Sequence, residues 1–230
     1  MAFAIPRSLL ARVPDRRALY TAMASVPWLI LALADRIPLL SSLCVAPSAE
    51  LLARLRIESL FAFDSSTIVA QAAAWLVMIA AMASPLVYPM AQYVMVRSRR
   101  DDRVPAVIAF LSGYIAVWMM ALILATSWLL CLALSLPASV IAPAAFAAAA
   151  LWQLCPIKSW AWRRCHRTWP ISVDGWTAAG SCLLLGMRHG TYCSIACLPM
   201  MAASMVGAPH VLAMLVVWAI AVGERFSQRP

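Results

Sequence analysis

The apolar residues of this chain fall in long blocks separated by short polar segments. A block of about 18 or more apolar residues is long enough for a helix to cross a bilayer. The two longest blocks divide at turn-forming residues, near Leu136-Pro137 and at Gly207-Ala208-Pro209. The pattern therefore predicts six spanning helices, roughly Leu19–Leu40, Thr67–Met95, Val104–Leu134, Ala138–Cys155, Ala178–Val206 and His210–Val222.

The positive charges follow the same division. Fourteen of the 18 basic residues lie in four segments that share one side of the membrane if six helices alternate in direction. Basic residues gather on the cytoplasmic side, so both termini are expected in the cytoplasm. These residues are Arg7, Arg12, Arg16 and Arg17, then Arg97, Arg99, Arg100 and Arg103, then Lys158, Arg163, Arg164 and Arg167, and finally Arg225 and Arg229.

The fold class predicted is all-α, a polytopic transmembrane bundle of about six helices in a bacterial inner membrane. A basic cytoplasmic tail occupies residues 1–18, a single transmembrane domain residues 19–223, and a second cytoplasmic tail residues 224–230. Residues 41–66 form an external loop. Its segment Glu50–Phe63 mixes leucine with Arg54, Arg56 and Glu58, which fits either an amphipathic helix on the outer surface or a polar loop. Pro27, Pro85, Pro89 and Pro199 are expected to kink helices.

Composition supports a membrane protein. Of the 230 residues, 64% are hydrophobic and 12% charged, whereas an average soluble domain has about 45–50% and about 25%. A soluble chain of this size has too little interior to hide so much apolar surface. The net charge of +9 lies between apolar blocks, so soluble, disordered and nucleic-acid-binding classes are excluded.

The residues best suited to chemistry lie in the fifth predicted helix. At about 100° per residue, Cys193, Cys197, Met200 and Cys182 all fall within about 80° of His189 on one stripe. Imidazole, thiol and thioether are soft ligands that favour Cu(I) first and then Zn(II). A single helix cannot enclose an ion, so other donors must come from facing helices. We predict Met82 as a ligand from a facing helix. Further soft donors are Met78, Met90, Met119 and Met120.

Other interpretations of this stripe stay open. Methionine and cysteine in membrane helices often only pack, and Gly186-x-x-x-Gly190 fits close helix contact. Thiol redox is a third possibility, although cysteines four residues apart lie near the limit of disulfide reach. Arg188 points away from the stripe, and a charge within a membrane is functional by default. We expect Arg188 to tune the site or to pair with a lipid or a carboxylate.

A second group lies in the predicted fourth loop, where Cys155 precedes Cys165-His166 by ten residues. This spacing matches no recognised zinc motif. A basic loop attracted to anionic lipid explains it, and so does a place where metal enters. The chain lacks a Walker loop, G-x-S-x-G, H-E-x-x-H and a dinucleotide fingerprint. Nucleotide-driven transport and ordinary hydrolysis therefore have no support, and an enzymatic activity is not expected.

Several blocks resemble the DUF2182 family of bacterial predicted metal-binding integral membrane proteins. They are Leu151–Lys158 followed by Arg163-Arg164-Cys165, the stretch from Gly186 through Tyr192 and Cys193 to Cys197 and Met201, Trp75-x-x-Met78-x-x-x-Met82-x-x-Pro85, Gly113-Tyr114-x-x-x-Trp118, and Glu224. The resemblance spans about Trp75 to Glu224. It implies a polytopic inner-membrane protein that handles metal, with copper one candidate. Ala196-Cys197-Leu198 stands where that family has Cys-Cys-Trp, so one thiol and one aromatic ring are missing.

The function predicted is a membrane protein that holds or delivers Cu(I), in support of a membrane or periplasmic metalloenzyme or of copper homeostasis. Its ligands are His189, Cys193, Cys197, Met200 and Met82, with Zn(II) as the alternative metal. Arg188, Cys182 and Tyr192 are supporting residues. The lipid bilayer is the expected surrounding, and no nucleic-acid partner is expected. A membrane thiol-redox protein and a non-catalytic accessory subunit remain alternatives.

Overall fold

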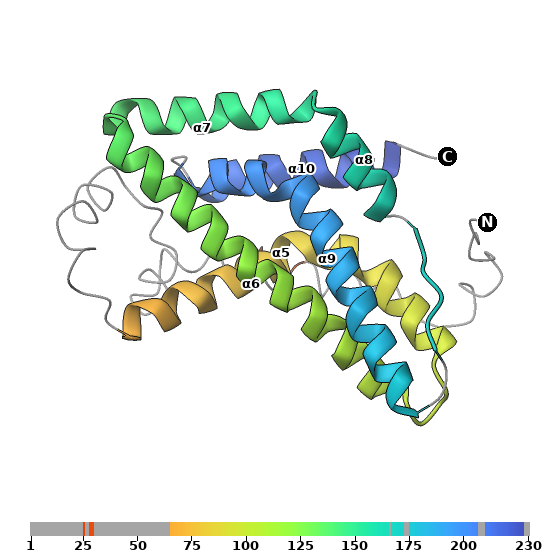
Figure 1. Ribbon diagram of the computed structural model, residues 1–230. Coiled ribbons are helices and arrows are strands. Elements are labelled where there is room, and N and C mark those ends of the chain that lie inside the picture. The colour runs from red at the N-terminus through yellow and green to blue at the C-terminus, as the bar shows by residue number, and fades with distance from the viewer. Residues whose placement is uncertain are drawn as a thin grey trace.

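The computed structural model describes residues 25, 28–29, 65–165, 167–172, 175–206 and 210–227. These ranges contain helices and no strand (Figure 1). The basic tail, most of the external loop and nearly all of the first predicted span lie outside them. The helices are α5 (Ser65–Arg97), α6 (Arg103–Ser135), α7 (Ala138–Gln153), α8 (Pro156–Cys165), α9 (Gly175–Val206) and α10 (His210–Ser227).

Helices α6 and α9 form the tightest contact of the fold, because glycines remove side chains where their backbones meet. A Cβ on Gly186 would lie 1.9 Å from the carbonyl oxygen of Phe110, and a Cβ on Gly113 would lie 2.3 Å from that of Leu183. Gly190 also faces α6 at close range. Small residues let membrane helices approach closely. The predicted role of Gly186-x-x-x-Gly190 in helix contact is therefore confirmed.

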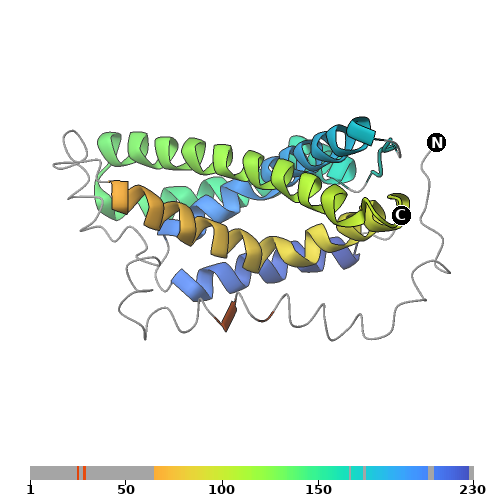
Figure 2. The ribbon, with the colours of Figure 1, turned by 90° about the horizontal axis from the view of Figure 1, so that it is seen from below.

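Helix α5 packs against α6 through two tryptophans. The indole N–H of Trp75 donates to the carbonyl oxygen of Trp118 at 2.9 Å, and the two rings lie 6.3 Å apart. Helix α5 bends by 76° between Trp75–Ser84 and Leu86–Arg97. Pro85 stands at this break, where its missing N–H interrupts the helical ladder. Seen from below, α5 lies between α6 and α10 (Figure 2).

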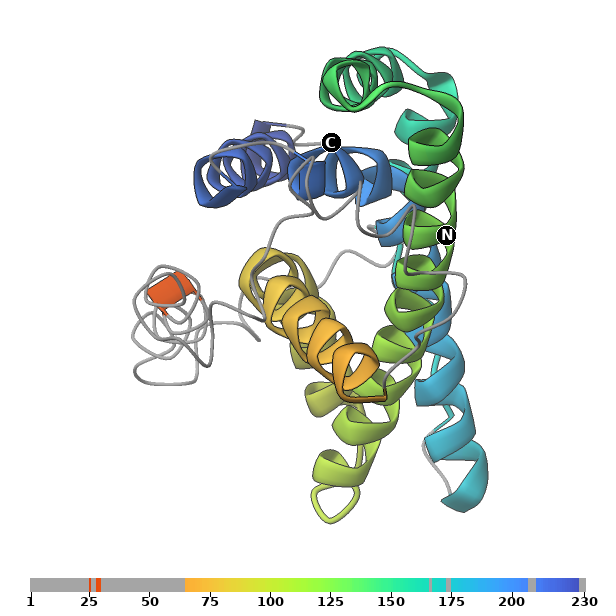
Figure 3. The same ribbon diagram turned by 90° about the vertical axis from the view of Figure 1, so that its left-hand side faces the viewer.

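The chain turns sharply between α6 and α7 at the predicted position. Leu136 is extended, with φ −124° and ψ 150°, and Pro137 follows it with φ −66°. A residue before proline avoids the helical region, so the helix ends there. Figure 3 shows α7 at the top of the bundle, away from α5. The indole N–H of Trp152 joins α7 to α9 by donating to the carbonyl oxygen of Ile195 at 3.1 Å.

The predicted fourth loop is not a simple basic loop, because residues 156–165 form helix α8. It meets the preceding helix at 67°. Its basic side chains divide between two environments: Arg163 is exposed, whereas Lys158 is buried together with Ala161, Trp162 and Cys165. The positions of the basic residues in the sequence do not show which of them faces solvent and which faces the interior of the bundle.

Part of α6, Arg103–Ala125, is long and apolar enough to cross a membrane. The two bent pairs, Trp75–Ser84 with Leu86–Arg97 and Ser139–Gln153 with Pro156–Cys165, raise that number to three within the described ranges if each pair is one span. The predicted all-helical class therefore holds for the described residues. The count of six spans stays a prediction.

Candidate metal centre

The predicted stripe of α9 faces the interior of the bundle. His189, Cys193, Cys197 and Met200 are each at most 6% exposed, and Cys182 is fully buried. Elsewhere in the described chain, most buried side chains are apolar, and only Lys158, Ser194 and Ser204 are also buried polar groups. An imidazole and several thiols thus lie together in an apolar surrounding.

His189 meets a thiol from another helix. The Sγ atom of Cys165, at the end of α8, lies 3.6 Å from Nδ1 and 3.9 Å from Nε2 of His189. The aromatic rings of Phe110 and Tyr114 on α6 lie 6.1 Å and 5.8 Å from the imidazole. These rings are four residues apart on one face of α6, so they cover the same side of the imidazole.

Cys193 lies at the centre of the group. The thiols of Cys165 and Cys197 lie close enough to interact with its thiol. The hydroxyl of Tyr114 also donates to Cys193 Sγ at 3.4 Å. We call Cys165, His189, Cys193 and Cys197 the thiol–imidazole cluster. It draws one donor from α8 and three from α9.

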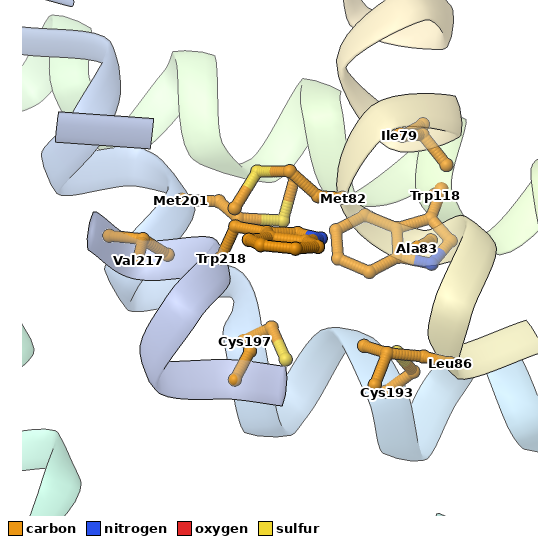
Figure 4. A pocket seen from close by; sticks show the side chains of 11 residues that line it. Ile79, Met82, Ala83, Leu86, Trp118, Cys193, Cys197, Met201, Val217 and Trp218 are labelled. Carbon is orange, nitrogen blue, oxygen red and sulfur yellow. The ribbon is translucent and has the colours of Figure 1, made fainter. Parts of the chain in front are cut away.

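A pocket opens beside Cys193 and Cys197 (Figure 4). Two methionines, Met82 from α5 and Met201 from α9, contribute thioethers to it, and the rings of Trp118 and Trp218 form part of its wall. The remaining lining residues are apolar: Ile79, Ala83, Leu86, Val217 and Ala221. Two thiols and two thioethers therefore face one small, largely apolar space.

The predicted ligands are not all brought together. Met82 faces the pocket, but Met200 faces α7, where its Sδ atom accepts a hydrogen bond from the side-chain amide of Gln153. Within the described ranges, no three His, Cys, Asp or Glu side chains stand in an arrangement that could hold an ion. Closing the thiol–imidazole cluster around an ion therefore requires its side chains to move.

The supporting residues lie around the cluster. The guanidinium of exposed Arg188 lies 4.8 Å from the ring centre of Trp169, so it stacks on an aromatic ring. Half-buried Tyr192 contacts Trp160 edge-on, with ring centres 5.5 Å apart. Cys182 is buried farther along α9, toward its N-terminus, and contributes no contact to the cluster that the structure records.

Sequence reasoning missed two members of this arrangement. Cys165 was assigned to a lipid-attracted loop or a point of metal entry, yet it contacts His189 directly. Tyr114 carried no predicted role, although Gly113-Tyr114-x-x-x-Trp118 was recognised as a block. The signal for Cys165 was its place in the resembling block, Leu151–Lys158 followed by Arg163-Arg164-Cys165. His166, its neighbour in the pattern, lies outside the described residues.

Comparison with known proteins identifies a family. The family model PpoB2, described as a copper chaperone, matches residues 72–230, which include every helix from α6 to α10 and most of α5. No curated protein and no solved structure matches the chain. The matched region contains the whole thiol–imidazole cluster and the adjoining pocket. The chain belongs to the PpoB2 family of copper chaperones.

Proposed function

We propose that this protein is a membrane-embedded copper chaperone that carries Cu(I) as its cargo in the thiol–imidazole cluster. Family membership supports copper handling. The observation that carries the site is the meeting of Cys165 with His189 and Cys193 inside the bundle. Thiolate and imidazole together are the ligands that Cu(I) prefers. Zn(II) is the alternative metal for the same donors.

The surroundings suit an ion that must be held and then released. Cu(I) needs deprotonated thiols, so binding expels protons from Cys165, Cys193 or Cys197. The Tyr114 hydroxyl remains in place to donate to the resulting sulfur, and hydrogen bonds to charged acceptors are stronger than those to neutral ones. Phe110 and Tyr114 shield the imidazole from water. The burial of the four cluster side chains keeps a redox-active ion away from solvent.

The pocket offers a second set of donors. Met82 and Met201 line the pocket together with Cys193 and Cys197, and thioethers bind Cu(I) without losing a proton. We assign Met82 to the copper path on this basis. Met200 is the weakest of the predicted ligands, because binding copper would break its contact with Gln153.

Membrane integration and topology belong to the same proposal. Large apolar side chains are exposed along α6 and α10, among them Ile108, Ile115 and Ile123 on α6 and Leu212 and Val216 on α10. Exposed apolar surface of this extent indicates contact with lipid or another protein. With the distribution of arginines, it supports six spans in a bacterial inner membrane with both termini in the cytoplasm. Delivery to a membrane or periplasmic copper enzyme is part of the same proposal.

A thiol-redox function is the second candidate, because the Cys193 thiol lies near two others, those of Cys165 and Cys197. Two thiols would give two electrons and two protons to a quinone, which leaves a disulfide and a quinol. This candidate predicts a disulfide that follows the redox state of the quinone pool. A copper chaperone is favoured instead if the thiols stay reduced in membranes whether the quinone pool is oxidised or reduced.

Metal binding by the purified full-length protein tests the proposal. We expect stoichiometric Cu(I) when the reduced protein is titrated without oxygen against a coloured Cu(I) chelator. His189→Ala and Cys193→Ser should abolish or greatly weaken binding. Cys182→Ser is the matched control, since it removes a buried thiol from α9 outside the cluster. Equal copper binding by the His189 and Cys193 variants and the unchanged protein would exclude this site.

A further inference from the structure

An ion pair between a buried lysine and a half-buried glutamate joins α8 to α10. The ammonium of Lys158 lies 2.6 Å from Oε1 of Glu224, and the two side chains are 6% and 29% exposed. Lys158 also donates to the side-chain oxygen of Gln153 at the end of α7. The amide of Gln153 in turn donates to the sulfur of Met200 on α9. One lysine thus connects α8 directly with α7 and α10, and through Gln153 with α9.

Lys158 and Cys165 share the buried face of α8. They are seven residues apart, which is close to two helical turns. One end of this short helix is therefore held by charge and hydrogen bonds, while the other end places its thiol against His189 and Cys193. A ten-residue helix has little stability of its own in isolation. Its position depends on these contacts and on the packing of Ala161 and Trp162.

Glu224 belongs to the helix that closes the pocket. Val217, Trp218 and Ala221 on α10 line that pocket, and Glu224 stands one turn beyond Ala221. The pair therefore attaches the helix that supplies Cys165 to the helix that covers Cys197 and Met201. A buried ion pair contributes little net stability compared with apolar residues of the same size, but removing one partner leaves a buried charge and is strongly unfavourable.

We infer that Lys158 and Glu224 form a latch that positions α8, so that an intact pair keeps Cys165 in the thiol–imidazole cluster and a broken pair opens the cluster for release of its cargo. They are positioning residues, since neither contacts the ion. The opening would separate Cys165 from three donors that stay on α9. The role in release rests on the proposed function, whereas the closure of α8 can be measured without copper.

The test is the rate at which a small maleimide modifies each cysteine of the reduced, copper-free, full-length protein, read by peptide mass spectrometry. In Glu224→Gln, we expect Cys165 to react about tenfold faster, because modification follows the population of the open form. Cys182 serves as the internal control, since it is buried on α9 away from α8. Arg163→Ala, on the exposed face of α8, should leave both rates unchanged.

Two results would overturn the latch. One is an unchanged Cys165 rate in both Glu224→Gln and Lys158→Met. The other is an equal increase at Cys165 and Cys182, which indicates general loss of stability. The double variant K158M/E224Q should open α8 no further than the more reactive single variant, because the two residues act as one pair. Additive effects would contradict the pairing.

Copper binding then separates this inference from the proposed function. Glu224→Gln should weaken Cu(I) binding in chelator competition, and the weakening should vanish when Cys165→Ser is already present. If the unchanged protein binds no Cu(I), the proposed function fails while the modification rates still decide whether the latch exists. If copper binds normally but Glu224→Gln does not alter its affinity, the latch has no role in the cargo site.

Discussion

The contact of α9 with α6 and its contact with α8 hold the same helix in opposite ways. Against α6, Gly186 and Gly113 bring the two backbones together with no space for a methyl group. Against α8, the recorded contacts run through side chains: the thiol of Cys165 on His189, and the Trp160 ring on Tyr192. The first contact cannot open without separating two long helices, whereas the second involves only a short helix.

This difference divides the cluster into a fixed part and a movable part. His189, Cys193 and Cys197 are carried by the helix that is locked to α6, so their spacing is set by one helical backbone. Cys165 is carried by α8, whose position depends on polar contacts at its other end. A chaperone needs strong binding and also release to a partner. Under the proposed function, we expect the fixed donors to serve the first need and the movable donor to serve the second.

Breaking the fixed contact should have the largest effect. Gly186→Ala places a Cβ against the Phe110 carbonyl, which is backbone and cannot move aside. We expect the free energy of unfolding in detergent to fall by about 3 kcal/mol or more, as for an overpacked core. Loss of the Tyr114–Cys193 contact and of Cu(I) binding should follow, because both depend on the distance between α6 and α9.

Gly180→Ala is the matched control for that change. It lies on the same helix, and a Cβ there meets nothing within 4 Å. Because alanine favours helix by about 1 kcal/mol over glycine, this variant should be as stable as the unchanged protein or slightly more stable. A similar loss of stability in both variants would show that the α6–α9 contact does not depend on the space at Gly186.

Removing one donor from each part should separate their contributions. Cys193→Ser takes the central thiol from the fixed part, and we expect Cu(I) affinity to fall about a hundredfold or more. Cys165→Ser leaves three donors on α9, so the fall should be smaller, about tenfold, with faster release. Chelator competition measures the affinities, and stopped-flow transfer to the chelator measures release. A larger loss of Cu(I) affinity in Cys165→Ser than in Cys193→Ser would contradict the division into a fixed and a movable part.

The common buried face of His189, Cys193 and Cys197 could be predicted because it is set locally. Cys193 and Cys197 follow His189 by one and two turns, and any helix places such residues on one face. The glycine spacing likewise indicated a close helix contact. The helix break at Leu136-Pro137 could be predicted from proline chemistry. In each case the information lies within a few residues, where backbone geometry alone decides the outcome.

The movable part could not be predicted in this way. Cys165 meets His189 across 24 positions, and Lys158 meets Glu224 across 66, so both contacts depend on how α8 folds back onto the bundle. A basic segment between apolar blocks is ordinarily a solvated loop, and nothing local marks Lys158 as the inward lysine. Met200 shows the opposite kind of error, in which a local pattern predicts a ligand that a distant contact removes. Helical spacing places Met200 on the stripe, but its sulfur contacts Gln153 of the neighbouring helix α7.

The smallest effect should come from the hydroxyl that joins α6 to the cluster. Tyr114→Phe keeps the ring beside His189 and removes only the hydrogen bond to Cys193 Sγ. Sulfur is a weak acceptor when neutral, so the stability should change by no more than about 1 kcal/mol. Metal-bound sulfur carries more negative charge and accepts more strongly, so we expect Cu(I) affinity to fall a few-fold.

Tyr192→Phe controls for the loss of a phenol, since Tyr192 lies on α9 and contacts α8 through its ring. That variant should bind copper as the unchanged protein does. If Tyr114→Phe also leaves the affinity unchanged, α6 acts only as a backbone support for α9, and the fixed part of the site consists of α9 alone. If it lowers the affinity, the contact of α6 with α9 carries a ligand-directed hydrogen bond as well as glycine packing.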